Sequence, residues 1–317
     1  MEIGGIAMKE ERYTHVSKTD GLEISVLRIE PDNAVDIKGI VQVVHGMNEY
    51  KERYIPFIQY LVGKGYLCVI HDHRGHGQSI KNPDDLGHMY EGGFEALIDD
   101  THEITLEIKE YAKKITGKDL PITLAGHSMG SMVVRSYIRK YDSDIEKLIV
   151  IGCPSKKPGM KAGLLLIKII KLFKGERFRS RLVASLVLGD FEKRFKSEGP
   201  SAWVNSDPEE VKKYRADPLC IYMFTLNGYE NLVRLTMRTY TDGGYAMKNP
   251  SLPIRFFSGA DDPCAISEKD FNKAVELLKK QGYTNVKGKM YKGLRHEILN
   301  EREKDTVYED MLSFIES

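Results

Sequence analysis

The chain has 317 residues, of which 41% are hydrophobic and 29% are charged, and its formal net charge is +1. This is the composition of a globular protein that can bury a large core without disulfides or a structural metal. The small net charge gives no indication of a nucleic-acid partner. No stretch approaches the roughly 20 apolar residues of a membrane span, and residues 1–15 lack the segments of a signal peptide. We therefore expect an unanchored cytoplasmic protein.

Short apolar, β-branched runs alternate along the chain with longer segments of helical period. Because helices of this length separate the runs, parallel pairing through right-handed crossovers is expected. The pattern predicts an α/β fold with a mostly parallel sheet and helices on both of its faces. In chain order, the predicted strands are residues 22–29, 39–45, 66–72, 121–125, 147–152, 254–259 and 286–291, and the predicted helices are residues 53–64, 94–115, 129–140, 267–281 and 301–315.

One long segment interrupts the alternation. Residues 153–250 show helical patterns but no convincing strand, and they are far too many for a loop between two strands. We expect a helical cap subdomain at 153–250, inserted into an α/β core formed by residues 1–152 and 251–317.

The four cysteines are scattered and form no CxxC pair, which favours buried free thiols in a reducing compartment. They are Cys68, Cys153, Cys220 and Cys264.

The strongest local signal for chemistry is the run Gly126-His127-Ser128-Met129-Gly130. It follows an apolar strand pattern and precedes a helical one, which is the setting of a nucleophile elbow. The glycines fit this setting, because side chains beside the strained serine turn would clash with neighbouring backbone. The pattern predicts that Ser128 is a nucleophile.

A serine nucleophile needs a base and a group that orients the base, in the chain order Ser, Asp or Glu, His. His296 is the only histidine after Ser128, and it follows a predicted strand. The acid is expected in the turn after the strand at 254–259, where Asp261 and Asp262 stand together. Spacing alone leaves both open.

The oxyanion formed during acyl transfer needs two fixed donors. The backbone amide of Met129, directly after the nucleophile, is expected to be one of them. The amide of Met47 is the other candidate, because Gly46 allows close backbone approach in the loop after a buried strand.

Together these motifs resemble the monoglyceride lipase and lysophospholipase branch of the α/β-hydrolases. The resemblance spans about residues 40–301 and rests on VVHGMNEY (43–50), HDHRGHGQS (71–79), LAGHSMGS (124–131), FSGADDP (257–263) and YKGLRHEILNE (291–301).

The resemblance implies Ser128 as nucleophile, His296 as base, Asp262 as acid, and the Met47 and Met129 amides as oxyanion hole. It implies a structural role for HDHRGHGQS. Because the sequence shows no set of metal ligands and no phosphate-binding loop, we expect no cofactor and no metal. The expected substrate is a single-chain acyl ester, such as a monoacylglycerol or a lysophospholipid.

Residues 160–173, from Met160 to Phe173, are apolar apart from three lysines, with Lys174 just beyond. Such a helix can pack over the active site, and it can also make transient contact with a membrane surface.

Two other functions remain open at this point. An aminopeptidase of the proline iminopeptidase type would need cap carboxylates to bind the substrate amine. A non-catalytic ligand-binding protein would keep the fold without needing the triad. The carboxylates available in the cap are those of Glu192, Glu198, Glu209, Glu210 and Glu230.

Overall fold

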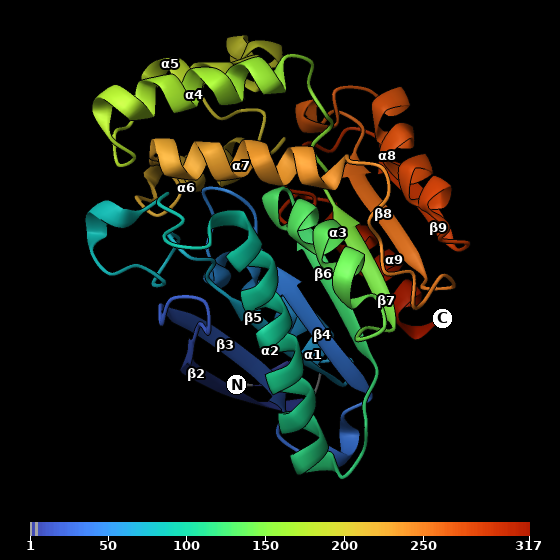
Figure 1. Cartoon of the computed structure of the whole chain (residues 1–317). Helices are drawn as coiled ribbons and strands as arrows, with labels where there is room; N and C mark the ends of the chain where they lie inside the picture. The colour runs from blue at the N-terminus through green and yellow to red at the C-terminus, as the bar shows by residue number, and fades with distance from the viewer. Residues whose placement is uncertain (1, 4–5) are drawn as a thin grey trace.

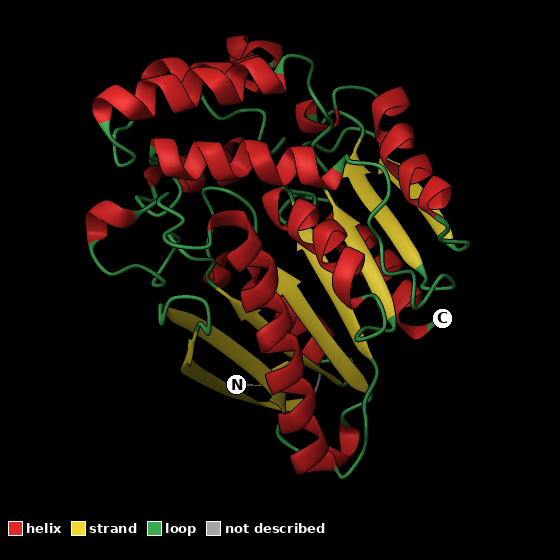
Figure 2. Cartoon of the chain, in the orientation of Figure 1, coloured by secondary structure: helices red, strands yellow, loops and turns green. Residues whose placement is uncertain are grey.

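A twisted sheet forms the centre of the molecule (Figures 1 and 2). The structure is a computed structural model that describes residues 2–3 and 6–317; residues 1, 4 and 5, at the start of the expected core, lie outside the described residues. Within the described part, the strand order is β1-β2-β3-β5-β4-β6-β7-β8-β9. The strands are β1 (Glu2–Ile3), β2 (Ile6–Val16), β3 (Glu23–Pro31), β4 (Gly39–Val44), β5 (Tyr66–His71), β6 (Ile122–His127), β7 (Lys147–Ile151), β8 (Ile254–Gly259) and β9 (Val286–Tyr291).

The strands from β5 through β9 in this order pair in parallel, whereas β1, β2 and β3 pair antiparallel. The mostly parallel α/β sheet predicted from the sequence is therefore confirmed. Strand β2 was not predicted from the sequence, and it pairs with β3 from Met8 opposite Pro31 to Val16 opposite Glu23. Its residues are mainly polar and charged because it lies near the edge of the sheet, so it lacks the apolar run of a central strand.

Helices cover both faces of the sheet, as predicted. Helices α2 (Gly93–Thr116), α3 (Met129–Tyr141) and α8 (Glu268–Gln281) pack on one face. Helices α1 (Ile55–Val62) and α9 (Lys304–Glu316) pack on the other. Strand β4 is buried along its whole length, which is why its sequence is apolar instead of alternating, apart from Gln42, whose side chain donates to the Thr101 carbonyl on α2. The predicted helices at 53–64 and 301–315 begin later than expected, at Ile55 and Lys304.

Between β7 and β8 the chain forms four α-helices and no strand, and every residue of this inserted segment (residues 153–250) is described. The helices lie over the end of the sheet at which the parallel strands terminate (Figure 1). They are α4 (Met160–Lys174), α5 (Arg181–Arg194), α6 (Pro208–Ala216) and α7 (Leu226–Thr239). In open α/β sheets, ligands bind at the carboxyl ends of the strands, so the inserted segment covers the expected location of a site.

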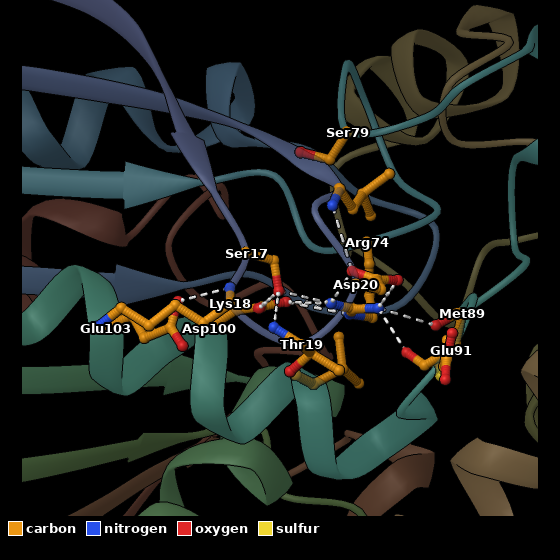
Figure 3. A network of polar contacts seen from close by, with 12 residues as sticks. Ser17, Lys18, Thr19, Asp20, Arg74, Ser79, Met89, Glu91, Asp100 and Glu103 are labelled. Atoms are coloured by element: carbon orange, nitrogen blue, oxygen red, sulfur yellow. Dashed lines mark hydrogen bonds and ion pairs between the residues drawn. The ribbon is translucent and has the colours of Figure 1, made fainter.

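The loop after β5 is held by buried charged groups (Figure 3). Arg74 donates to Asp100 on α2 at 3.0 Å and to Asp20 in the turn between β2 and β3 at 3.0 Å. Ser17 also donates to Asp100. In the same loop, Asp72 accepts from both the backbone amide and the ammonium of Lys51. These contacts tie the HDHRGHGQS stretch to the N-terminal strands and to α2.

All four cysteines are free and buried, as the sequence suggested. Among the described residues, no helix is both long and apolar enough to span a bilayer.

Candidate active site

Ser128 stands at a sharp turn between β6 and α3. Its backbone has φ 53° and ψ −115°, an uncommon conformation for a residue with a side chain. The flanking glycines make this turn possible. A Cβ at Gly126 would lie 2.4 Å from the carbonyl oxygen of Gly130, and one at Gly130 would lie 2.2 Å from that of Val44. The strained strand–turn–helix geometry is that of a nucleophile elbow.

The structure brings Ser128, His296 and Asp262 together from three separate parts of the chain. His296 Nε2 lies 2.8 Å from Ser128 Oγ, and His296 Nδ1 lies 2.9 Å from Asp262 Oδ2. Asp261, the alternative left open by spacing, is 46% exposed at its side chain and pairs with Arg194. Of the two carboxylates in the turn after β8, Asp262 is therefore the one that contacts His296.

Asp262 is held as a carboxylate by its partners. Burial alone would raise its pKa, but attraction to His296, together with hydrogen bonds from His296 and the Cys264 amide, brings the pKa below its ordinary value. An ionised Asp262 accepts from Nδ1–H of His296, which leaves Nε2 of the neutral ring to accept from the Ser128 hydroxyl.

The loop after β4 lies directly against the serine. A Cβ at Gly46 would stand 2.9 Å from Ser128 Cβ, so only glycine allows the following residue to come this close. Met47 and Met129 both line the cavity beside Ser128. Met129 is also the first residue of α3, where backbone amides have no intrahelical acceptor. Both residues are therefore placed where their amides could face a developing oxyanion.

Glu49, in the same loop, and His127 form a buried charged pair that was not predicted from the sequence. Glu49 Oε1 lies 2.7 Å from His127 Nδ1, and Tyr54 donates to Glu49 Oε2 at 2.9 Å. Burial would raise the pKa of Glu49, but the charge of His127 and its hydrogen bond lower the pKa below its ordinary value. Burial alone would lower the pKa of His127, but Glu49 raises it above its ordinary value. Nε2 of His127 lies 3.2 Å from the backbone oxygen of His296. The pair of Glu49 and His127 therefore links the Gly46–Glu49 loop to the loop that carries His296.

A second charged pair lies beside it. Arg53 donates to both carboxylate oxygens of Glu297, the residue after His296, at 2.7 and 2.6 Å. The sequence carried one signal for these residues: Glu49 and Arg53 follow the predicted strand at 39–45, and Glu297 adjoins the predicted base.

A cavity of about 840 Å³ extends from Ser128 into the inserted segment. This volume lies in the range of sites that enclose small molecules. Ser128 and His296 are among the residues that line the cavity, and most of the other lining residues are apolar. The wall residues contributed by α4, α5 and α7 include Met160, Leu166, Ile167, Val183, Val187 and Val233.

The cap carboxylates that an aminopeptidase would use are engaged elsewhere. Glu192 is the only one of the five that lines the cavity, and it accepts from the Ser201 amide and the Trp203 indole. The other four each form an ion pair with a lysine or arginine: Glu198 with Arg295, Glu209 with Lys212, Glu210 with Lys213, and Glu230 with Lys171 and Arg234.

One cluster among the described residues has the spacing of metal ligands, and it consists of Asp262, Cys264 and His296. Two of these groups are already hydrogen-bonded to each other, and His296 also contacts Ser128. The carboxylate and the imidazole of this cluster are therefore already engaged in hydrogen bonds with protein groups. Among the three histidines of the loop after β5, the ring of His73 contacts those of His71 and His76.

Comparison with known proteins agrees with this geometry. The model of the family described as serine aminopeptidase, S33 matches residues 35–303. A monoacylglycerol lipase of Mycolicibacterium smegmatis is 26% identical over 286 residues, which cover 89% of each chain. The monoglyceride lipase of Homo sapiens is 26% identical over 282 residues, which cover 83% of this chain and 77% of that protein. A thermostable carboxyl esterase from Bacillus coagulans, solved with glycerol, superposes with a TM-score of 0.85 at 25% identity, over 98% of this chain and 99% of the esterase.

These matches cover the sheet, the loop that carries Ser128 and the inserted segment alike. The chain therefore belongs to the serine aminopeptidase S33 family, and it is an α/β-hydrolase of the branch that contains monoglyceride lipases and lysophospholipases.

Proposed function

We propose that this protein hydrolyses the ester bond of single-chain acyl lipids, of the monoacylglycerol or lysophospholipid type, through an acyl-enzyme on Ser128. The observation that carries the proposal is the ordered contact of Ser128, His296 and Asp262 at the floor of a largely apolar cavity. Such a cavity suits one acyl chain and brings its ester carbon to the serine. The relatives named monoacylglycerol lipase support the same substrate class.

In the first step, Ser128 Oγ attacks the ester carbonyl carbon while His296 Nε2 takes the hydroxyl proton. The amides of Met47 and Met129 stabilise the oxyanion. Collapse of the tetrahedral intermediate breaks the bond to the alcohol, which leaves with the proton from His296. In the second step, His296 takes a proton from water, the hydroxide attacks the acyl-enzyme, and the fatty acid departs as Ser128 regains its proton. Asp262 stays ionised throughout and orients the imidazole.

In this proposal residues 153–250 act as a cap over a core formed by residues 1–152 and 251–317. The cap supplies the acyl-binding wall, since α4, α5 and α7 face the cavity. Acyl-chain preference would then be set by the cap, and the chemistry by the core.

Ser128→Ala tests the mechanism. We expect it to abolish turnover of a p-nitrophenyl ester and labelling by a fluorophosphonate probe. Retention of even a few per cent of wild-type turnover by a correctly folded variant would contradict the acyl-enzyme. A panel of monoacylglycerols and lysophospholipids of graded chain length tests the substrate class, with an aminoacyl naphthylamide as the peptidase control. Faster turnover of the naphthylamide would favour an aminopeptidase instead.

We also propose that the outer surface of the cap makes transient contact with a lipid surface. Helix α4 buries Ile167 but exposes apolar side chains on its outer side, with Leu172 81% and Phe173 78% exposed. Leu182 and Leu186 of α5 are also exposed, each at 57%. Exposed lysines of α4 flank this apolar surface, which fits the anionic head groups of a membrane. They are Lys161, Lys168 and Lys174.

Vesicle flotation tests this contact. We expect binding to vesicles of phosphatidylcholine with phosphatidylglycerol, and loss of that binding in the double variant Leu172→Gln, Phe173→Gln. Leu106→Gln is the matched control. Leu106 is also exposed, at 46%, but it lies on α2, outside the inserted segment. Equal flotation of all three proteins would contradict the proposal.

A further inference from the structure

The only tryptophan in the chain lies against the proposed catalytic base. The ring centroid of Trp203 is 5.1 Å from that of His296, at an interplanar angle of 45°. The ring of His127 also contacts His296, at 4.7 Å. The His296 imidazole is thus enclosed by one aromatic ring from the core and one from the inserted segment.

Trp203 is itself held in place by α5. Its indole N–H donates to Glu192 Oε1 at 3.1 Å, and its ring lies 5.1 Å from that of Phe191. The same Glu192 carboxylate accepts from the backbone amide of Ser201, at 3.2 and 3.0 Å. Ser201 has φ 60°, which is uncommon for a residue other than glycine. One side chain of α5 therefore fixes both the turn and the indole that the turn carries.

The turn around Trp203 is also bound to the histidine loop through its backbone. The Glu297 amide donates to the Val204 carbonyl at 2.8 Å, and Arg295 donates to the Ala202 carbonyl at 2.6 Å. These two donors are the residues directly before and after His296. The segment around Trp203 and the loop that carries the base thus form one hydrogen-bonded unit, although they are more than 90 residues apart in the sequence.

We propose that Trp203 is a positioning residue for His296, and that Glu192 holds Trp203 in that position. This rests on the proposed role of His296 as base. The ring of Trp203 limits rotation of the imidazole and keeps water from it, so Nε2 stays aimed at Ser128 Oγ. Because misplacing a reacting group by about 1 Å can cost roughly 100-fold in rate, the inserted segment contributes to the chemical step as well as to acyl binding.

The test uses p-nitrophenyl acetate, whose acyl group is too short to fill the cavity, with kcat and KM measured separately. We expect Trp203→Ala to lower kcat by about 10- to 100-fold at nearly unchanged KM. Trp203→Phe keeps a ring against His296, so its kcat should stay within about threefold of wild type. Glu192→Gln keeps an oxygen acceptor for the indole and should behave like wild type, whereas Glu192→Ala should lose about tenfold in kcat.

Lys193→Gln is the matched control, because Lys193 is the next residue of α5 and its side chain is 77% exposed. Thermal midpoints establish that each variant is folded; if Trp203→Ala is not, the Glu192 pair decides the question. A rise in KM at constant kcat, or equal kcat losses in Trp203→Phe and Trp203→Ala, would overturn the proposal. Failure of a fluorophosphonate to label wild-type Ser128 would instead refute the proposed function, so the two failures are distinguishable.

Discussion

We expect four buried histidines to make the stability of this protein sensitive to acid. The ring of His73 lies 4.6 Å from that of His45 and 5.0 Å from that of His71, and the ring of His76 lies 5.3 Å from that of His45. Burial lowers the pKa of His45 to about 4 and that of His71 and His76 to about 3. The pKa of His73 is lowered by burial too.

The sign of the effect follows from linkage. A histidine whose pKa is lower in the folded state than in the unfolded state is neutral when folded, and the unfolded chain binds the proton more readily. Its stabilisation is present above the unfolded pKa of 6.5, and it is lost as the pH falls toward the folded pKa. At pH 5, about 1.5 units below 6.5, each such histidine lowers the free energy of unfolding by roughly 2 kcal/mol. Three of them cost roughly 6 kcal/mol, which is a large part of the ~5–15 kcal/mol stability of a typical domain.

His71→Leu isolates one of these contributions. Neither ring nitrogen of His71 has a hydrogen-bond partner among the described residues, so the substitution removes a proton-binding group and breaks no hydrogen bond. We expect the variant, relative to wild type, to gain roughly 2 kcal/mol more at pH 5 than at pH 8. Urea unfolding at both pH values measures this, and any constant packing change cancels in the comparison.

His15→Gln is a control of opposite sign. Hydrogen bonding to Glu107, with a further bond to Glu103, raises the pKa of His15 despite partial burial. Its stabilisation is therefore present below 6.5 and is lost as the pH rises through the folded pKa. The His15 variant should lose stability mainly at pH 5. If the His71→Leu difference were the same at pH 5 and pH 8, the reasoning about the buried cluster would be wrong.

Four further substitutions test other parts of the structure. Asp262→Asn should lower kcat by roughly 10⁴-fold, as loss of the orienting carboxylate does in serine hydrolases, whereas Asp261→Asn should keep kcat within about twofold, both measured by ester turnover. Gly130→Ala would place a methyl carbon 2.2 Å from a carbonyl oxygen at the end of β4, so we expect a lower thermal midpoint together with loss of activity. Arg74→Met leaves the Asp100 carboxylate buried without its cation and should cost about 3–5 kcal/mol in urea unfolding.

Each of these expectations can fail on its own. A slow Asp261→Asn enzyme and a fast Asp262→Asn enzyme would reverse the assignment of the acid. A Gly130→Ala protein with wild-type turnover would mean that the start of α3 can move away from β4. An Arg74→Met protein as stable as wild type would show that the network in Figure 3 contributes little to folding.

The sequence by itself determined the features that depend on neighbouring residues. The alternation of apolar strands with amphipathic helices indicated a parallel sheet, because burial on both faces leaves a continuous apolar run. The glycines around Ser128 indicated a strained turn, because only residues without a side chain fit so close to neighbouring backbone. The placement of His296 after a strand could also be recognised without a structure.

Only the tertiary structure decided the features that depend on contacts between distant segments. It placed Asp262 against His296 and Asp261 against Arg194, because the path of the turn sets the direction of each side chain. It showed β2 as a strand, since near the edge of a sheet pairing with β3 suffices without an apolar run. It also brought Glu49 to His127 and Trp203 to His296, contacts that leave no periodic signal because burial and charge pairing act through space, not along the chain.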